Sequence, residues 1–108
     1  MKVQTVSQTG VGSSDALVMN TNISPFNVGF GVIVSGTVNY TVQHTFDDVF
    51  ASDFDPTTAK WFNHSSVSGV STDQDGNYAF PVSAIRVVLS GGSTGTVDTT
   101  ILQAGIGA

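Results

Sequence analysis

Residues 26–44 read FNVGFGVIVSGTVNYTVQH, and this stretch decides the fold class of the chain. On both sides of a Ser35-Gly36 turn, apolar residues alternate with small or polar ones, which is the period of a strand with one buried face. The side chains expected to face inward are Phe26, Val28, Phe30, Val32 and Val34 before the turn, and Val38, Tyr40, Val42 and His44 after it. Two such runs joined by a short turn predict a β-hairpin.

The remainder of the chain repeats this pattern in shorter runs. Val, Ile, Thr, Phe, Tyr and Trp total 44 of the 108 residues, and their restricted rotamers favour strands over helices. Residues 91–95 are expected to turn the strand at 84–90 back onto the strand at 96–103. We therefore predict an all-β fold, an antiparallel two-sheet β-sandwich of jelly-roll type with about seven or eight strands. It comprises residues 16–108, preceded by an N-terminal edge strand or arm at residues 1–15.

Composition narrows the possible functions. The chain has 3 Lys and Arg against 8 Asp and no Glu, with 10% charged residues, where about 25% is usual. So few cations argue against a nucleic-acid partner, and the lack of Cys excludes a thiol nucleophile or zinc–thiolate site. No apolar run approaches the roughly 20 residues of a membrane span, and residues 1–10 lack the apolar region of an export signal. The polar, weakly charged surface fits either a chain that lies against other protein or a Ser/Thr-rich extracellular domain.

Asp73, Asp75 and Asn77 match the first three side-chain positions of a calcium-binding loop. The remainder of the motif fails, because the glycine is Gly76 and the position that should hold a bidentate Glu is Ala84. Asp-Gly and Gly-Asn are common turn dipeptides. We therefore predict a tight turn over residues 73–77 and no metal site.

The chain has one other His and Asp set that could bind a metal or act as an acid–base pair, namely His44, Asp47, Asp48 and His64. Their spacing matches no known signature, so we expect hydrogen-bonded histidines at the rim of the sandwich. There is no G-x-S-x-G elbow, and the glycine-rich residues 91–95 lack the Lys of a phosphate-binding loop. These absences favour a protein that is not an enzyme and uses no cofactor.

The segment 45–63 differs from the strands around it because aromatic and acidic residues are mixed in no regular period. We expect a long, packed and partly exposed excursion. Trp61 and Phe62 could stack on a sugar ring or anchor a protein interface, or they could plug the open end of the sandwich.

Four separated blocks of the chain resemble a group of small tailed-bacteriophage virion structural proteins. They are residues 40–48 (YTVQHTFDD), 61–64 (WFNH), 77–82 with 84–86 (NYAFPV and AIR), and a strand ending at 101–103 (ILQ). The resemblance runs from Tyr40 to Gln103 and leaves the N-terminal third uncovered. It implies a non-enzymatic head decoration or cement protein of β-sandwich fold that binds the major capsid protein lattice, on the capsid surface of the virion.

Such a subunit is expected to be made in the host cytoplasm and to act as a symmetric dimer or trimer that bridges capsomers. The aromatic excursion and the N-terminal segment are the expected contact surfaces. The candidate partner-binding residues are Phe46, Phe50, Phe54, Trp61, Phe62, Val3 and Val6. Two alternatives remain open: a tail, neck or adaptor structural subunit, and a carbohydrate-binding module that uses Trp61 as a stacking platform.

Overall fold

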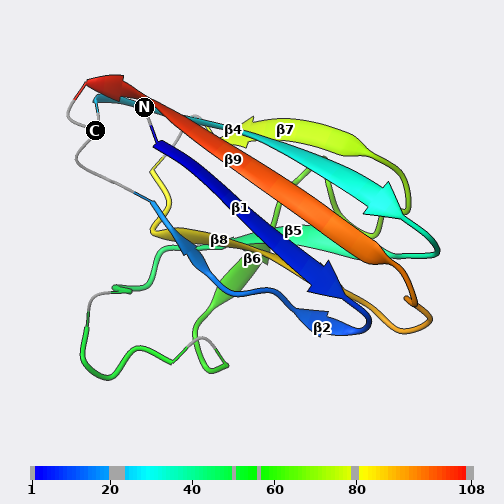
Figure 1. Cartoon of the computed structure of the whole chain (residues 1–108). Coiled ribbons are helices and arrows are strands. Elements are labelled where there is room, and N and C mark those ends of the chain that lie inside the picture. The colour runs from blue at the N-terminus through cyan, green and yellow to red at the C-terminus, as the bar shows by residue number, and fades with distance from the viewer. Residues whose placement is uncertain (1, 20–23, 50, 56, 79–80, 107–108) are drawn as a thin grey trace.

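The computed structural model describes residues 2–19, 24–49, 51–55, 57–78 and 81–106, and these form two antiparallel β-sheets that face each other (Figure 1). The first sheet has the order β1 (Lys2–Thr9), β9 (Thr96–Ile106), β4 (Ser24–Ser35), β7 (Gln74–Tyr78). The second sheet contains β2 (Gly12–Ser13), β3 (Leu17–Val18), β8 (Ala84–Leu89), β5 (Tyr40–Thr45) and β6 (Trp61–Asn63). No helix occurs in the described ranges, so the predicted all-β, two-sheet architecture is confirmed.

The core between the sheets is built from the alternating faces that the sequence indicated. In β4 and β5, Val28, Phe30, Val32, Tyr40 and Val42 are all buried. The same alternation places further buried side chains on β8 and β9, namely Ile85, Val87, Leu89, Val97 and Ile101. Burial of one face of each strand is the main stabilising contribution of such a sandwich.

The prediction of β-hairpins at Ser35-Gly36 and at residues 91–95 is wrong. β4 pairs with β7 and β9, whereas β5 pairs with β6 and β8, so the turn at Ser35 and Gly36 carries the chain from one sheet to the other. Residues 91–95 likewise connect β8 to β9 across the sandwich. Facing sheets lie about 10 Å apart, a span that three or four extended residues can bridge. Alternation reports which face of a strand is buried, but it carries no information on which strand lies beside it.

Residues 73–77 also differ from the expectation, because most of them form the edge strand β7 and no tight turn. Gly76 lies opposite Phe30 of β4 in the ladder, and an added Cβ at Gly76 would be 2.7 Å from Phe30 Cζ. The glycine is therefore explained by close packing on an aromatic ring. Asp73 accepts a hydrogen bond from Val34 N at 2.7 Å, while Asp75 and Asn77 are exposed.

The N-terminal segment takes part in both sheets. β1 lies at the edge of the first sheet and pairs with β9 from Lys2 to Thr9. The chain then crosses to the second sheet, where both β2 and β3 pair with β8. Between them, Ser14 Oγ accepts a hydrogen bond from Val87 N at 2.9 Å, replacing a backbone partner where the strand is interrupted.

Candidate functional site

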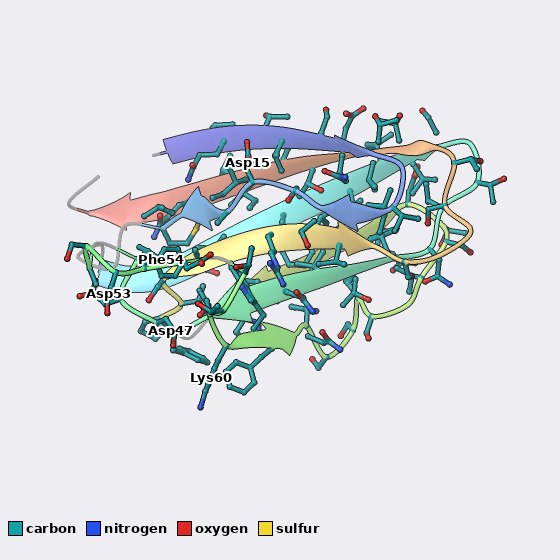
Figure 2. The ribbon with its side chains drawn as sticks, turned by 90° about the horizontal axis from the view of Figure 1, so that it is seen from below. Asp15, Asp47, Asp53, Phe54 and Lys60 are labelled. Atoms are coloured by element: carbon teal, nitrogen blue, oxygen red, sulfur yellow. The ribbon has the colours of Figure 1, made fainter. Side chains whose placement is uncertain are left out.

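The aromatic excursion occupies residues 46–60, between β5 and β6, at one end of the sandwich (Figure 1). Two hydrogen bonds join the ends of the excursion. Thr45 Oγ1 donates to Lys60 O at 2.8 Å, and Lys60 N donates to Asp47 Oδ2 at 3.0 Å. The Lys60 side chain points away from the ribbon (Figure 2). The predicted excursion extended to residue 63, but Trp61–Asn63 pair with β5 as strand β6. The ends of the excursion are therefore held on the sheet.

Phe46 and Phe62 form an exposed aromatic pair beside the end of β5. Their ring centroids are 5.7 Å apart, and 54% of Phe46 and 51% of Phe62 is exposed. Both rings rest on the buried His44, at centroid distances of 5.4 Å and 5.9 Å. Among the residues that the structure describes, Phe46 and Phe62 are two of six exposed large apolar side chains. Two neighbouring phenyl rings with half their surface in water mark a candidate contact site.

A buried aromatic cluster supports this pair from below. His44 Nδ1 lies 2.9 Å from the Tyr78 hydroxyl, and the two rings meet edge to face. Phe30 and His64 also pack on Tyr78, with centroids 5.8 Å and 5.0 Å away. Because Tyr78 belongs to the first sheet and His44 to the second, the cluster joins the two sheets on the side where β6 and β7 are the edge strands.

Both histidines are buried and hydrogen bonded, as the sequence predicted. His64 Nδ1 accepts a hydrogen bond from Ser66 N at 3.1 Å. Its Nε2 lies 3.1 Å from Asn77 O, so it donates to that carbonyl. In this arrangement Nε2 is the donor and Nδ1 the acceptor of the His64 ring. In the part of the chain that the structure describes, no three His or Asp side chains are grouped to hold a metal ion.

Burial sets the protonation of His44 and Tyr78. It lowers the pKa of His44, an effect reinforced by the nearby His64, and it raises the pKa of Tyr78. His44 is therefore neutral and Tyr78 protonated near neutral pH, and the Tyr78 hydroxyl can donate to His44 Nδ1.

Acid is expected to destabilise the fold through His44. Because the pKa of His44 is lower in the folded chain than in the unfolded one, the unfolded chain binds more protons in acid. The stabilisation is fully present above the unfolded value of about 6.5 and is lost as the pH falls below it toward the folded value. Urea titrations between about pH 7 and pH 5 measure this loss. A His44→Asn variant should show a smaller loss over the same range, and an equal loss would mean that another group is responsible.

Trp61 lies on the opposite face of β6 from Phe62, because successive strand residues point to opposite sides. The Arg86 guanidinium lies over its ring at 4.1 Å from the centroid. Arg86 Nε donates to Gln43 Oε1 at 3.0 Å, and Gln43 Nε2 donates to Asn63 Oδ1 at 2.9 Å. Trp61 and Phe62, which the sequence presented as a pair, are thus divided between two faces of the second sheet.

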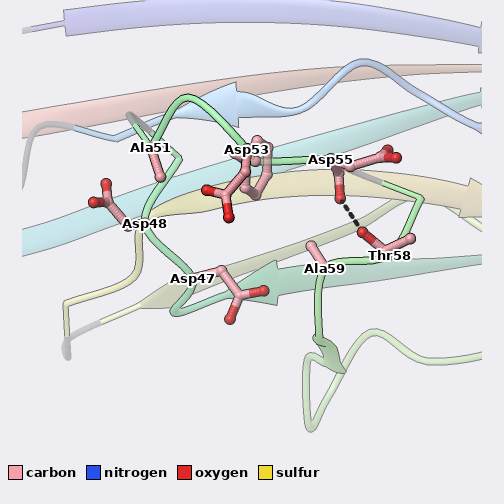
Figure 3. A pocket seen from close by; sticks show the side chains of 8 residues that line it. Asp47, Asp48, Ala51, Asp53, Asp55, Thr58 and Ala59 are labelled. Atoms are coloured by element: carbon pink, nitrogen blue, oxygen red, sulfur yellow. Dashed lines mark hydrogen bonds between the residues drawn. The ribbon is translucent and has the colours of Figure 1, made fainter.

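The acidic residues of the excursion surround a hollow of about 280 Å³ (Figure 3). Figure 3 also shows the bond from Thr58 Oγ1 to Asp55 O, 3.3 Å long. The residues that line the hollow are Asp47, Asp48, Ala51, Asp53, Phe54, Asp55, Thr58 and Ala59.

Two of the predicted contact residues belong to this part of the chain. Phe54 lines the hollow and is half-buried. Phe50 lies outside the described residues.

Val3 and Val6 are not close to the aromatic residues. They belong to β1, which forms the edge of the first sheet opposite to β7. Val3 points outward and is 53% exposed, while Val6 is half-buried on the inner side. The candidate contact residues therefore fall on at least two separate surfaces. Sequence reasoning missed Tyr78, whose only signal was its place in an aromatic-rich block.

No protein-family model, curated protein or solved structure matches the chain. Among the described residues there is also no helix with the length and apolar character required to cross a membrane.

Proposed function

We propose that this chain is a virion structural protein, a capsid decoration or cement subunit that binds the major capsid protein lattice of a tailed bacteriophage at the capsid surface. The observation that carries the proposal is the exposed aromatic pair of Phe46 and Phe62, which packs on the buried, hydrogen-bonded His44 and Tyr78. Exposed aromatic rings that are already ordered lose little conformational freedom on binding, which is typical of interface hot spots.

The strand order supports a finer assignment of the fold. We infer a jelly roll of eight strands, because β2 and β3 both pair with β8 and count as one interrupted strand. The two sheets then have the orders β1-β9-β4-β7 and β2/β3-β8-β5-β6, and every connection except that from β5 to β6 changes sheet. Jelly rolls occur in viral capsid proteins and in lectins. The fold alone does not choose between these functions.

Surface chemistry favours the structural role. A net charge of -5 with only 10% charged residues gives weak repulsion between neighbouring subunits. A decoration subunit that binds the assembled shell, and not the free capsid protein, stabilises the shell by mass action. This physical argument agrees with the resemblance of residues 40–103 to phage virion proteins.

The sugar-binding alternative has less support. A stacking platform needs an open ring face, and the Arg86 guanidinium already covers one face of Trp61 at 4.1 Å. The tail, neck or adaptor alternative is distinguished by location. A cryo-EM map of the purified particle should show the chain on the outer face of the capsid. Density confined to the portal or tail would assign it to the adaptor class, and a particle without the chain would contradict any virion role.

Replacing the aromatic pair is expected to weaken capsid binding. The double change Phe46→Ser and Phe62→Ser removes two half-exposed rings without opening the core, and we expect affinity for undecorated capsids to fall about tenfold or more. Occupancy is measured by quantitative gel analysis of capsids sedimented with increasing amounts of protein.

Ile33→Ser provides the matched control. Ile33 is equally exposed, at 58%, but lies on β4 of the first sheet, away from the excursion. Its loss should leave capsid occupancy unchanged. If the double variant binds as well as the unmodified chain, the aromatic pair is not the contact site.

A further inference from the structure

β1 is an exposed strand edge that is unlike the other three edges of the sandwich. Among the described strands it pairs with β9 alone, in continuous register over eight residues. From Val3 to Thr9 it contains no charged residue and no proline. Proteins usually block such edges by shortening, interrupting or charging them, because an open edge is a template for another strand.

The other edges of this molecule carry those protective features. β7 is five residues long and contains Asp75. β6 is three residues long and directly follows Lys60. The edge formed by β2 and β3 is interrupted between them, where Asp15 is exposed. In contrast to these three edges, β1 leaves a long, regular edge open to pairing with a further strand.

The hydrogen bond just beyond the end of β1 shows which backbone groups of β1 face β9 and which point away from it. Gly10 N donates to Gly95 O at 3.2 Å, and this pair continues the register in which Thr9 lies opposite Thr96. In an antiparallel ladder, hydrogen-bonded and non-hydrogen-bonded pairs alternate. Since Gly10 is a hydrogen-bonded position, the backbone N–H and C=O groups of Val3, Thr5 and Ser7 are directed away from β9.

We propose that β1 pairs antiparallel with β1 of a second copy of this chain, joining two first sheets into one continuous eight-stranded sheet about a two-fold axis. With the axis at Thr5, Thr5 lies opposite its own copy and Val3 lies opposite Ser7 of the other copy. The outward groups then form about six backbone hydrogen bonds. A two-fold interface brings identical residues together. In this register the small, uncharged Val3, Thr5 and Ser7 lie opposite one another, and Lys2, the charged residue of β1, lies opposite Gln8 of the other copy, so no like charges meet.

This dimer goes beyond the proposed capsid role and does not depend on it. The aromatic pair lies on the side of the sandwich where β6 and β7 are the edges, so edge pairing through β1 leaves it accessible. The same geometry would let each dimer present two copies of the aromatic pair to a surface.

The test compares lysine substitutions at two exposed threonines that lie side by side on neighbouring strands of the first sheet. Thr5 on β1 and Thr100 on β9 are direct ladder partners, and both are exposed. Sedimentation velocity of the purified full chain at about 0.1 mM should show a dimer. Thr5→Lys places like charges opposite each other at the edge and should raise the dimer dissociation constant about tenfold or more. Thr100→Lys adds the same charge on β9, the strand next to the edge strand, and should leave the dimer intact.

A second edge variant separates loss of pairing from loss of folding. Thr5→Pro removes an N–H that is directed away from β9, so the ladder within the chain keeps its bonds. Its circular dichroism should match that of the unmodified chain while the dimer is lost. If the unmodified chain is a monomer at this concentration, the proposal is overturned, and the edge would then bind a strand of a different protein. Dissociation by Thr100→Lys as strong as that by Thr5→Lys would also overturn it, in favour of packing between sheet faces. Because no capsid is present, neither failure bears on the proposed capsid role.

Discussion

Gly95→Ala is expected to lower the free energy of unfolding by about 3 kcal/mol or more, because among the glycines whose surroundings the structure describes an added Cβ meets its shortest contact here. A Cβ at Gly95 would lie 2.1 Å from Ser35 O and 3.0 Å from Gly36 Cα. Both obstacles are backbone atoms, so no side-chain rotation can relieve the overlap. Urea unfolding followed by tryptophan fluorescence measures the loss through the single Trp61.

The surrounding hydrogen bonds prevent the backbone at Gly95 from moving aside. Thr94 N and Gly95 N both donate to Thr37 O at 2.9 Å, and Gly95 O accepts from Gly10 N. Three connections between the sheets meet at this point. Gly36 has a φ of 83°, in the region that favours glycine. The connection from β4 to β5 therefore has little freedom to adjust.

Gly91→Ala is the control for this prediction. Gly91 lies in the same connection between β8 and β9, and an added Cβ there would meet nothing within 4 Å. We expect a change within about 0.5 kcal/mol. If both variants lost the same stability, loop entropy rather than the contact with Ser35 would explain the result.

Gly76→Ala is expected to cost about 2 kcal/mol and to disturb the support of the aromatic pair. The new Cβ would be 2.7 Å from Phe30 Cζ and 3.2 Å from His64 Cε1. Phe30 is buried and held edge to face against His64, with ring centroids 5.1 Å apart, so its ring cannot swing away freely. The near-ultraviolet circular dichroism of Tyr78 and the urea midpoint report the two effects.

Gly31→Ala tests whether any alanine in this sheet would have the same effect. Gly31 lies on β4, opposite Asp75, the neighbour of Gly76 in β7. A Cβ placed on Gly31 has no neighbouring atom within 4 Å. Alanine should be neutral or stabilise by up to about 1 kcal/mol, because it restricts the unfolded chain more than glycine does. Equal destabilisation at both positions would contradict the role assigned to the contact with Phe30.

Part of the candidate site could be predicted from the sequence. The mixed aromatic and acidic composition of residues 45–63 marked an exposed excursion, and Phe46 and Phe62 are indeed exposed. The sequence grouped Trp61 with Phe62, but their places in β6 put them on opposite faces. This error arises because neighbours in sequence need not share a surface. Val3 and Val6 were assigned to a contact surface of their own, and they lie on β1, at the edge of the first sheet opposite to β7.

The amino-acid sequence by itself determined that the chain is all-β, which faces of β4, β5, β8 and β9 are buried, and how little charge the surface carries. Each of these properties depends on residue type and on the two-residue period of a strand, which are local. Only the tertiary structure decided that the two predicted hairpins are crossings between sheets, that residues 74–78 are a strand, and that Tyr78 joins His44. Those outcomes depend on which distant segments pack together, as in the contact of Gly95 with Ser35, and no local period encodes that choice.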